Sequence, residues 1–175
     1  MKVTLIRHTS VNVEKGTCYG WSDVPVAATF EQEAAVTKAA LEGKTFDIVY
    51  TSPLSRARLL AAYCGFPDAV TDDRLKEMNM GDWEMRKYDT INDPNLQAWY
   101  DDYIHLAATN GESFTMLYHR VEAFLDELKA SSRSSAAIFA HGGVLLCAGL
   151  YAGLYTTERL FDNLTPYGGI LEINI

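Results

Sequence analysis

The sequence is poor in basic residues. Of its 175 residues, 15 are lysine or arginine and 23 are aspartate or glutamate, which gives a formal net charge of −8. Nucleic acids and anionic membrane surfaces bind proteins that present a basic face. We therefore expect no nucleic acid partner, and an anionic ligand would need a local basic pocket.

Cysteine and long apolar runs are also scarce. The three cysteines, Cys18, Cys64 and Cys147, are odd in number and irregularly spaced, which is typical of reduced thiols in the cytoplasm. No apolar run approaches the roughly 20 residues of a membrane span, and Val3–Ile6 is too short for the apolar part of a signal peptide. We predict a cytoplasmic protein with no membrane span, formed by a single domain over residues 1–175. The oligomeric state stays open, with a homodimer as the alternative to a monomer.

Apolar runs and helical patterns alternate along the chain. The predicted strands are Lys2–Arg7, Phe46–Tyr50, Ala69–Thr71, Ser135–Ala140, Leu160–Leu164 and Gly169–Ile175. The predicted helices are Glu31–Leu41, Pro53–Cys64, Tyr88–Ala108 with an interruption at Pro94, Phe114–Leu128 and Val144–Leu154. This alternation predicts an α/β fold, a three-layer α/β/α sandwich with a mostly parallel central sheet.

Two histidines stand at the ends of predicted strands. His8 follows Arg7 at the end of the first strand, and His141 follows the strand that begins at Ser135. Ligands of open α/β folds bind at the carboxyl ends of the strands. An arginine beside a histidine at this edge indicates a site for an anion and a nucleophilic imidazole, unless two of the four histidines reach strand ends by chance.

Four segments contain the candidate residues, and their order is more specific than any one of them. They are Arg7-His8-Thr9, Ser52–Arg58, Leu75–Glu84 and His141-Gly142-Gly143. In this order and at these separations they resemble the histidine phosphatase superfamily, also called the phosphoglycerate mutase-like family. The resemblance covers nearly the whole chain and includes Gly111-Glu112-Ser113 before a helix with Arg120. It implies a phosphoglycerate mutase-like fold.

The resemblance implies a catalytic role for three residues. His8 would be the nucleophile that takes the phosphoryl group, Glu77 the proton donor to the leaving oxygen, and His141 would complete the phosphate pocket. The attacking imidazole must be neutral with one ring nitrogen free, so the other should donate to a fixed acceptor such as a backbone carbonyl. Glu84 lies in the same segment as Glu77 and is the alternative acid.

The resemblance also implies how the phosphate is held. Arg7 and Arg56 would clamp its oxygens, which suits the forked guanidinium, and the amide at Gly142 would add a donor where a helix begins. The family needs no metal, and we expect no cofactor. The alternative for the two arginines is a surface ion pair, and Arg58 is expected to be solvated because it points away from Arg56 on a helix.

The loop after His8 favours one branch of the family. Gly16–Pro25 with Thr29-Phe30 is similar to α-ribazole phosphatases of the cobalamin pathway, a branch that often replaces the glycine after the catalytic histidine, as Thr9 does here. This implies hydrolysis of a small phosphate monoester, α-ribazole 5′-phosphate or adenosylcobalamin 5′-phosphate. Thr9 and the loop residues Tyr19, Gly20 and Trp21 would border the substrate. The rings of Tyr19 and Trp21 could stack on a base of the substrate. The alternative is that they only pack against the protein.

Two positions depart from the family pattern. The asparagine that usually contacts phosphate falls on Glu14 in ungapped register, so that contact would pass to Ser10, Thr9 or a main-chain amide. Met85 stands where a glycine is usual, which predicts a different turn after Trp83-Glu84.

The sequence excludes two other classes of phosphate-binding enzyme. No cysteine has an arginine six positions later, as a cysteine phosphatase requires, and Gly43-Lys44 lacks the first glycine of a P-loop. The remaining alternatives are a broad-specificity sugar or nucleotide monophosphatase, a phosphoglycerate mutase-like enzyme, and a catalytically weak protein that binds phospho-ligands. His105 and His119 match no family motif, and we expect both in exposed helical positions.

Overall fold

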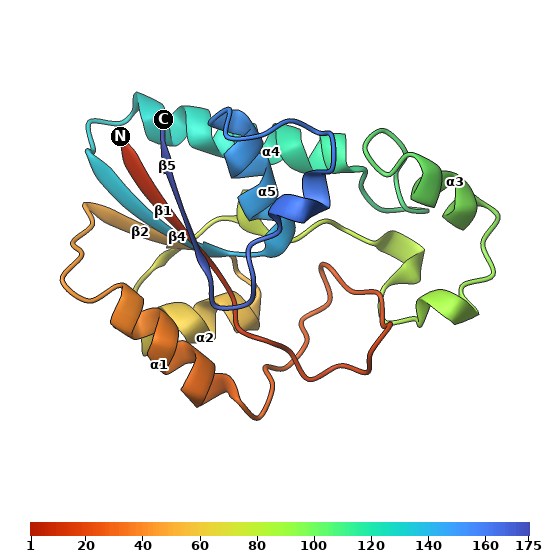
Figure 1. Ribbon diagram of the computed structural model, residues 1–175, viewed down its shortest axis with the longest axis horizontal. Coiled ribbons are helices and arrows are strands. Elements are labelled where there is room, and N and C mark those ends of the chain that lie inside the picture. The colour runs from red at the N-terminus through yellow and green to blue at the C-terminus, as the bar shows by residue number, and fades with distance from the viewer.

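The computed structural model describes residues 1–175, and its centre is a five-stranded sheet (Figure 1). The strands are β1 (Lys2–Arg7), β2 (Ile48–Thr51), β3 (Val70–Thr71), β4 (Ser135–Ala140) and β5 (Ile170–Asn174). They lie in the order β3-β2-β4-β1-β5, and all neighbours are parallel except β5, which runs antiparallel to β1 at the edge. The mostly parallel sheet predicted from the sequence is confirmed.

Helices cover both faces of this sheet (Figure 1). The covering helices are α1 (Phe30–Ala40), α2 (Ser55–Tyr63), α4 (Phe114–Ala130) and α5 (Gly142–Tyr151), while the short α3 (Asn95–Asp101) lies apart from the sheet. The α1 and α2 helices lie on one face, and α4 and α5 lie on the other, which is the predicted α/β/α sandwich. No helix is both long enough and apolar enough to cross a lipid bilayer.

The central strands are apolar without alternation because both of their faces are buried. Val3 and Leu5 of β1 pack in a core of 19 buried residues with α4 and α5. Ile6 of β1 and Phe139 of β4 point to the opposite face and join a core of eight buried residues with α1 and α2. The predicted α4 stripe, which includes Phe114, Leu117 and Val121, is buried in the larger core as expected.

One sequence prediction of secondary structure is wrong, and another is right only in part. Leu160–Leu164 is not a strand, because Leu160–Asn163 forms a 3₁₀ helix in which Leu160 alone is buried. Tyr88–Ala108 is helical only in part: the helix predicted to open at Pro94 is present as the short α3. The rest is irregular apart from a 3₁₀ helix at Tyr88–Thr90, and His105 lies in an exposed turn and not in a helix. Both segments contain apolar residues at helix-like or strand-like intervals, but those of the second segment, including Ile91, Trp99 and Ala108, pack in a separate small core. His119 is exposed on α4, as predicted.

The irregular segment after β3 packs around a small core of its own. This segment follows β3 and begins with two further 3₁₀ helices, Asp73–Leu75 and Gly81–Trp83. The small core consists of Cys18, Met80, Trp83, Ile91, Trp99 and Ala108. Trp83 is fully buried and its indole Nε1 donates to Asp93 at 2.7 Å, which fixes the ring within this core. This core anchors the segment beside the carboxyl ends of the strands (Figure 1).

Backbone hydrogen bonds bring the ends of three strands together. The His8 amide donates to the Ala140 carbonyl at 3.0 Å, and the Ser52 amide donates to the Phe139 carbonyl at 2.9 Å. His141 follows β4 directly and precedes α5. The residues that follow β1, β2 and β4 therefore meet at one edge of the sheet, where ligands of α/β folds bind.

Candidate active site

His8 is held in one tautomer by the backbone. Its side chain is buried, with 3% of the residue exposed, and ring atom Nδ1 lies 2.6 Å from the Thr9 carbonyl oxygen. A carbonyl oxygen only accepts hydrogen bonds, so Nδ1 bears the proton and donates it. In the neutral ring this leaves Nε2 with a free lone pair. The backbone acceptor expected from the sequence is present.

The surroundings of His8 also keep its ring neutral. Burial, together with the positive charges of Arg56 and Arg7, lowers the pKa of His8 from 6.5 to about 3. His141 lies edge-on to it, with the ring centroids 5.1 Å apart, and burial lowers the pKa of His141 well below its usual range. Nε2 of His141 is 2.7 Å from Oγ of Ser52, and its Nδ1 has no protein partner.

Arg7 and Arg56 bring positive charge to this edge without an acidic partner. Arg56, near the start of α2, is fully buried and donates to the carbonyl oxygens of Ser22 at 2.9 Å and Gly20 at 2.6 Å. Arg7 donates to the Thr165 carbonyl at 2.6 Å. The Nε atoms of both arginines are buried and have no protein partner. Neither arginine forms the surface ion pair that was its alternative role, so both charges remain available to an anion.

Glu77 enters the same edge on the segment that leads into the small core. Its carboxylate accepts from the amide of Gly143 at 3.1 Å and from the amide of Met78 at 2.9 Å. Behind it, Arg120 donates to the Glu77 carbonyl at 2.8 Å and forms a two-point ion pair with Glu112, with both distances 2.9 Å. Arg120 thus connects the helix α4 to the backbone that positions the Glu77 carboxylate.

Glu84, the alternative acid, is occupied by structural contacts. Its carboxylate accepts from the amides of Gly20, Trp21, Ser22 and Met80, at 2.8–3.1 Å, and from the Ser22 hydroxyl at 2.6 Å. Burial raises the pKa of Glu84, but these donors outweigh burial and hold the pKa below its usual value. The Glu84 carboxylate, ionised and bound by five donors, connects the Gly20–Ser22 loop to the segment at Met80. It is therefore poorly suited to donate a proton.

The glycine pair after His141 allows the backbone to approach two charged side chains. A Cβ atom on Gly142 would lie 3.2 Å from the Arg7 guanidinium, and one on Gly143 would lie 2.3 Å from Glu77 Oε1. Both glycines are in the first turn of α5, the end of a helix that favours an anion, and the Gly143 amide already binds the Glu77 carboxylate. The close approach, rather than backbone flexibility, explains this pair.

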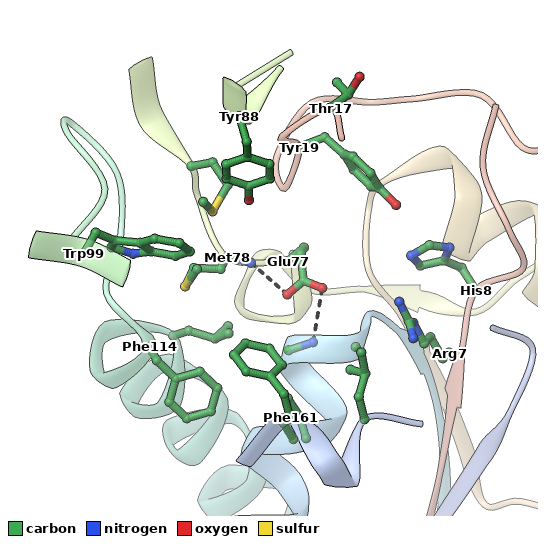
Figure 2. A pocket seen from close by; sticks show the side chains of 16 residues that line it. Arg7, His8, Thr17, Tyr19, Glu77, Met78, Tyr88, Trp99, Phe114 and Phe161 are labelled. Atoms are coloured by element: carbon green, nitrogen blue, oxygen red, sulfur yellow. Dashed lines mark hydrogen bonds between the residues drawn. The ribbon is translucent and has the colours of Figure 1, made fainter. Parts of the chain in front are cut away.

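Several of these residues line one cavity of about 320 Å³ (Figure 2). The predicted site residues that line it are Arg7, His8, Tyr19, Glu77 and Gly142. Arg56 and His141 lie directly behind them, with the Arg56 guanidinium 5.5 Å from the Tyr19 ring and His141 against His8. No group of three or more histidine, cysteine, aspartate or glutamate side chains is arranged to bind a metal ion.

The remaining predicted substrate contacts lie outside this cavity. Thr9 is fully buried and contributes its carbonyl to His8, and the Gly20 carbonyl binds Arg56. The ring of Trp21 lies against the ammonium group of Lys76, 4.9 Å from the ring centroid, and 39% of Trp21 is exposed. The structure therefore does not bring Trp21 to the site.

Glu14, which occupies the sequence position of the family asparagine, does not reach the cavity. Glu14 is exposed and forms an ion pair with Lys87, away from the cavity. Ser10 is bonded through its amide and hydroxyl to Glu33. The Thr9 hydroxyl is buried without a hydrogen-bond partner. Of Ser10 and Thr9, the two side chains that could replace the asparagine, only Thr9 therefore has a hydroxyl free to contact a phosphate.

Sequence reasoning missed one residue beside His8 and the role of another. Tyr167 packs its ring against Arg7, 4.1 Å from the guanidinium carbon, and lies 5.5 Å from the His8 ring. It precedes β5 in a turn that has no motif. Arg120 was noted in a family-like segment, but nothing in the sequence connected it to Glu77.

Comparisons with known proteins place the whole chain among its relatives. The family model for the histidine phosphatase superfamily (branch 1) matches residues 3–173. An adenosylcobalamin/α-ribazole phosphatase of Escherichia coli (strain K12) is 34% identical over 155 residues, which cover 83% of this chain and 75% of that protein. The α-ribazole phosphatase structure from Shigella flexneri has a TM-score of 0.87 at 29% identity, covering 100% of this chain and 91% of the other. A phosphoglycerate mutase structure from Thermus thermophilus has a TM-score of 0.80 at 28% identity, covering 99% and 93%.

Proposed function

The chain belongs to the histidine phosphatase superfamily, and we propose that it hydrolyses phosphate monoesters through a phosphohistidine on His8. One observation supports this above the others: the Nδ1 hydrogen bond to Thr9 leaves the lone pair of Nε2 free, in a ring that burial keeps neutral. A nucleophile of this kind beside Arg7 and Arg56, which have no carboxylate partners, is suited to attack on phosphorus.

In the first proposed step the Nε2 lone pair of His8 forms a bond to phosphorus. The bond between phosphorus and the leaving oxygen breaks, and Glu77 gives its proton to that oxygen, so the alcohol departs neutral. The negative charge of the bound phosphate favours the protonated form of Glu77 before this step. The unpaired Nε atoms of Arg7 and Arg56 and the amide of Gly142 are the donors that we assign to the phosphate oxygens.

In the second proposed step a water molecule replaces the histidine. Its oxygen forms a bond to phosphorus, the bond between phosphorus and Nε2 breaks, and the water gives one proton back to the Glu77 carboxylate. Inorganic phosphate leaves, and His8 and Glu77 return to their starting states. His141, whose Nδ1 has no protein partner, would contact a phosphate oxygen throughout. Two arginines supply the positive charge of the site, so the proposed mechanism requires no metal.

For the substrate we propose α-ribazole 5′-phosphate. Support comes from the two relatives that are named as α-ribazole phosphatases. The loop Gly16–Pro25, whose sequence is similar to that of α-ribazole phosphatases, also contacts the site. Tyr19 lines the cavity, and the Gly20 carbonyl accepts a hydrogen bond from Arg56. A protein that only binds phospho-ligands would have no use for a proton donor at Glu77, which favours an enzyme.

Two measurements test this proposal. Rapid quenching with labelled substrate should trap a phosphoryl group that is stable in base and labile in acid, and His8→Ala should abolish it and lower kcat by about three orders of magnitude or more. Near-normal turnover in folded His8→Ala protein would refute the mechanism. A screen with α-ribazole 5′-phosphate, phosphoglycerate, nucleotides and sugar phosphates tests the substrate. A flat profile would leave a general monophosphatase.

A further inference from the structure

The cavity beside His8 continues into an apolar compartment. Five side chains define it: Met78, Tyr88, Trp99, Phe114 and Phe161, called here the aromatic chamber. They come from five segments, namely the Glu77 segment, the 3₁₀ helices at Tyr88–Thr90 and Leu160–Asn163, and the helices α3 and α4. Ten of the 16 residues that line the whole cavity are hydrophobic, and those at the end away from His8 make up this chamber.

Glu77 stands between the two ends of the cavity. Figure 2 shows its carboxylate with His8 and Arg7 on one side and the aromatic chamber on the other. A phosphate at His8 would place its leaving oxygen at Glu77. The rest of the leaving group would then extend from that oxygen into the aromatic chamber.

The charged side chains of the cavity are confined to the His8 end. Arg7, His8 and Glu77 lie there, and no lysine, arginine, aspartate or glutamate lines the chamber itself. A carboxylate on the leaving group would therefore lose its water without gaining a cation, and it would also face the Glu77 carboxyl. Burial of an unpaired charge in this way is strongly unfavourable. Aromatic and methionine side chains instead favour a flat apolar ring.

The two walls of the chamber differ in rigidity. The inner wall is fixed, because Trp99 is buried and packs edge-on against Trp83 with ring centroids 5.5 Å apart. The outer wall is Phe161, of which 52% is exposed and whose ring lies 5.0 Å from Tyr103. An exposed phenylalanine at the mouth of an apolar cavity is a surface that a ligand would cover.

We propose that the aromatic chamber binds the leaving group and selects substrates whose leaving group is uncharged and contains a flat apolar ring. This rests on the proposed phosphatase function. It moves the base-binding surface from the Trp21 loop, where the sequence suggested it, to the segments that follow Glu77. It also disfavours phosphoglycerate and other substrates with an acidic leaving group.

Three phosphate monoesters of similar alcohols test the chamber: naphthylethyl phosphate, ethyl phosphate and phosphoglycerate. The native protein should show kcat/KM for naphthylethyl phosphate at least about tenfold above ethyl phosphate, mainly through KM, because a ring is buried. Phosphoglycerate should be the poorest of the three. Equal kcat/KM for all three with His8-dependent turnover would overturn the chamber and leave the proposed function intact.

Variants at Phe161 sharpen the test, since a side chain this exposed can be replaced without disturbing the fold. Phe161→Ala should reduce the naphthyl preference about fivefold and leave ethyl phosphate within about twofold. Leu154→Ala, with 53% of Leu154 exposed and outside the cavity, is the matched control and should change nothing. Phe161→Arg adds a cation to the chamber, so kcat/KM for phosphoglycerate should rise while that for naphthylethyl phosphate falls. A fall for both substrates would count against the proposed selectivity.

Binding of naphthylpropyl phosphonate, measured by calorimetry, separates the two proposals. This compound has no bond that the protein can hydrolyse, so its affinity reports the chamber even if no substrate is turned over. We expect binding at least about tenfold tighter than that of ethyl phosphonate, with the difference reduced about fivefold by Phe161→Ala. Equal affinity for the two phosphonates would refute the chamber regardless of catalysis.

Discussion

The hydroxyl oxygens of Tyr19 and Tyr167 lie 3.0 Å apart and connect two segments that are 148 positions apart in the sequence. Each ring also faces an arginine of the site: Tyr167 lies 4.1 Å from the guanidinium carbon of Arg7, and Tyr19 lies 5.5 Å from that of Arg56. Ring faces attract cations without neutralising them. The two tyrosines thus cover the arginines while leaving their charge available to a phosphate.

Removal of the Tyr167 ring should weaken phosphate binding. We expect Tyr167→Ala to raise the inhibition constant of inorganic phosphate about fivefold, because Arg7 loses a cation–π contact worth about 1 kcal/mol. Tyr167→Phe keeps the ring and loses only the hydroxyl bond to Tyr19, so its constant should stay within about twofold. If Tyr167→Phe were as impaired as Tyr167→Ala, the hydroxyl rather than the ring would be the important group.

Loss of the Glu77 carboxyl should be visible mainly with poor leaving groups. Glu77→Gln should lower kcat for an alkyl phosphate by about two orders of magnitude or more, since an alkoxide needs a proton. The loss with p-nitrophenyl phosphate should be far smaller, because that phenolate leaves without help. Glu84→Gln is the control: it removes acceptors for the loop amides, so it should lower stability and affect both substrates alike. A larger leaving-group effect from Glu84→Gln would transfer the acid role to Glu84.

A single methyl group should reproduce part of the Glu77 defect. The Cβ of Gly143→Ala would lie 2.3 Å from Glu77 Oε1, so the carboxylate must move and lose the Gly143 amide. We expect kcat to fall about tenfold or more for an alkyl phosphate and much less for p-nitrophenyl phosphate. The Cβ would also lie 2.9 Å from Cδ2 of Leu117, which is fully buried in the larger core, so the melting temperature should fall by a few degrees. An unchanged ratio between the two substrates would show that Glu77 does not depend on this contact.

Stability should fall as the pH is lowered below neutrality. In the folded state burial, with Arg56 and Arg7, lowers the pKa of His8 from 6.5 to about 3, and burial lowers the pKa of His141 as well. Between pH 6.5 and about 3 the unfolded chain binds protons that the folded chain does not, so the free energy of unfolding rises with pH in this window. Well below pH 6.5 each histidine contributes a slope of about 1.4 kcal/mol per pH unit.

Urea unfolding in phosphate-free buffer at about pH 7, 6 and 5 measures this slope. This range lies above the usual titration of carboxylates, so histidines dominate it. The variant His8→Asn should show a shallower dependence than the native protein, because one of the two buried rings no longer titrates. Identical slopes for both proteins would mean that His8 is protonated in the folded state.

The sequence was sufficient for the parts of this site that belong to strand ends. His8 and His141 follow apolar runs that are buried on both faces, and such runs are distinctive. Arg56 could be placed because a proline just after β2 marks the start of a helix. These features depend on residues that are close together in the chain, and the structure bears out the three-layer fold that they predicted.

Features that depend on contacts between distant segments were not predictable in this way. Trp21 is close to His8 in the chain, yet its ring turns outward to Lys76. Of the chamber side chains, Phe161 comes from a segment that the sequence pattern assigned to a strand but that forms a 3₁₀ helix. Trp99 lies in the helix predicted after Pro94, but the sequence did not indicate that this helix packs beside the site. Tyr167 shows no periodicity or motif, because its role arises only when the turn before β5 folds back over Arg7.

Met85 offers a test of how a departure from the family pattern is accommodated. Met85 adopts a φ of +62°, the left-handed conformation that glycine favours, and its amide donates to the Cys18 carbonyl at 2.8 Å. That the turn differs from the family's stays a prediction. A side chain in this conformation costs about 1 kcal/mol or more. Because 53% of Met85 is exposed, its side chain gains little packing energy to compensate for that backbone strain.

Met85→Gly should therefore stabilise the protein, by up to ~1 kcal/mol, because relief of strain exceeds the entropy that glycine adds to the unfolded chain. Met116 is the matched control, since 51% of it is exposed but it lies in the first turn of α4. Met116→Gly should destabilise by about 0.5–1 kcal/mol, because glycine is unfavourable in a helix. Urea unfolding of both variants measures whether each substitution raises or lowers the free energy of unfolding. Destabilisation by both substitutions would mean that the Met85 side chain makes contacts in the folded protein that outweigh its backbone strain.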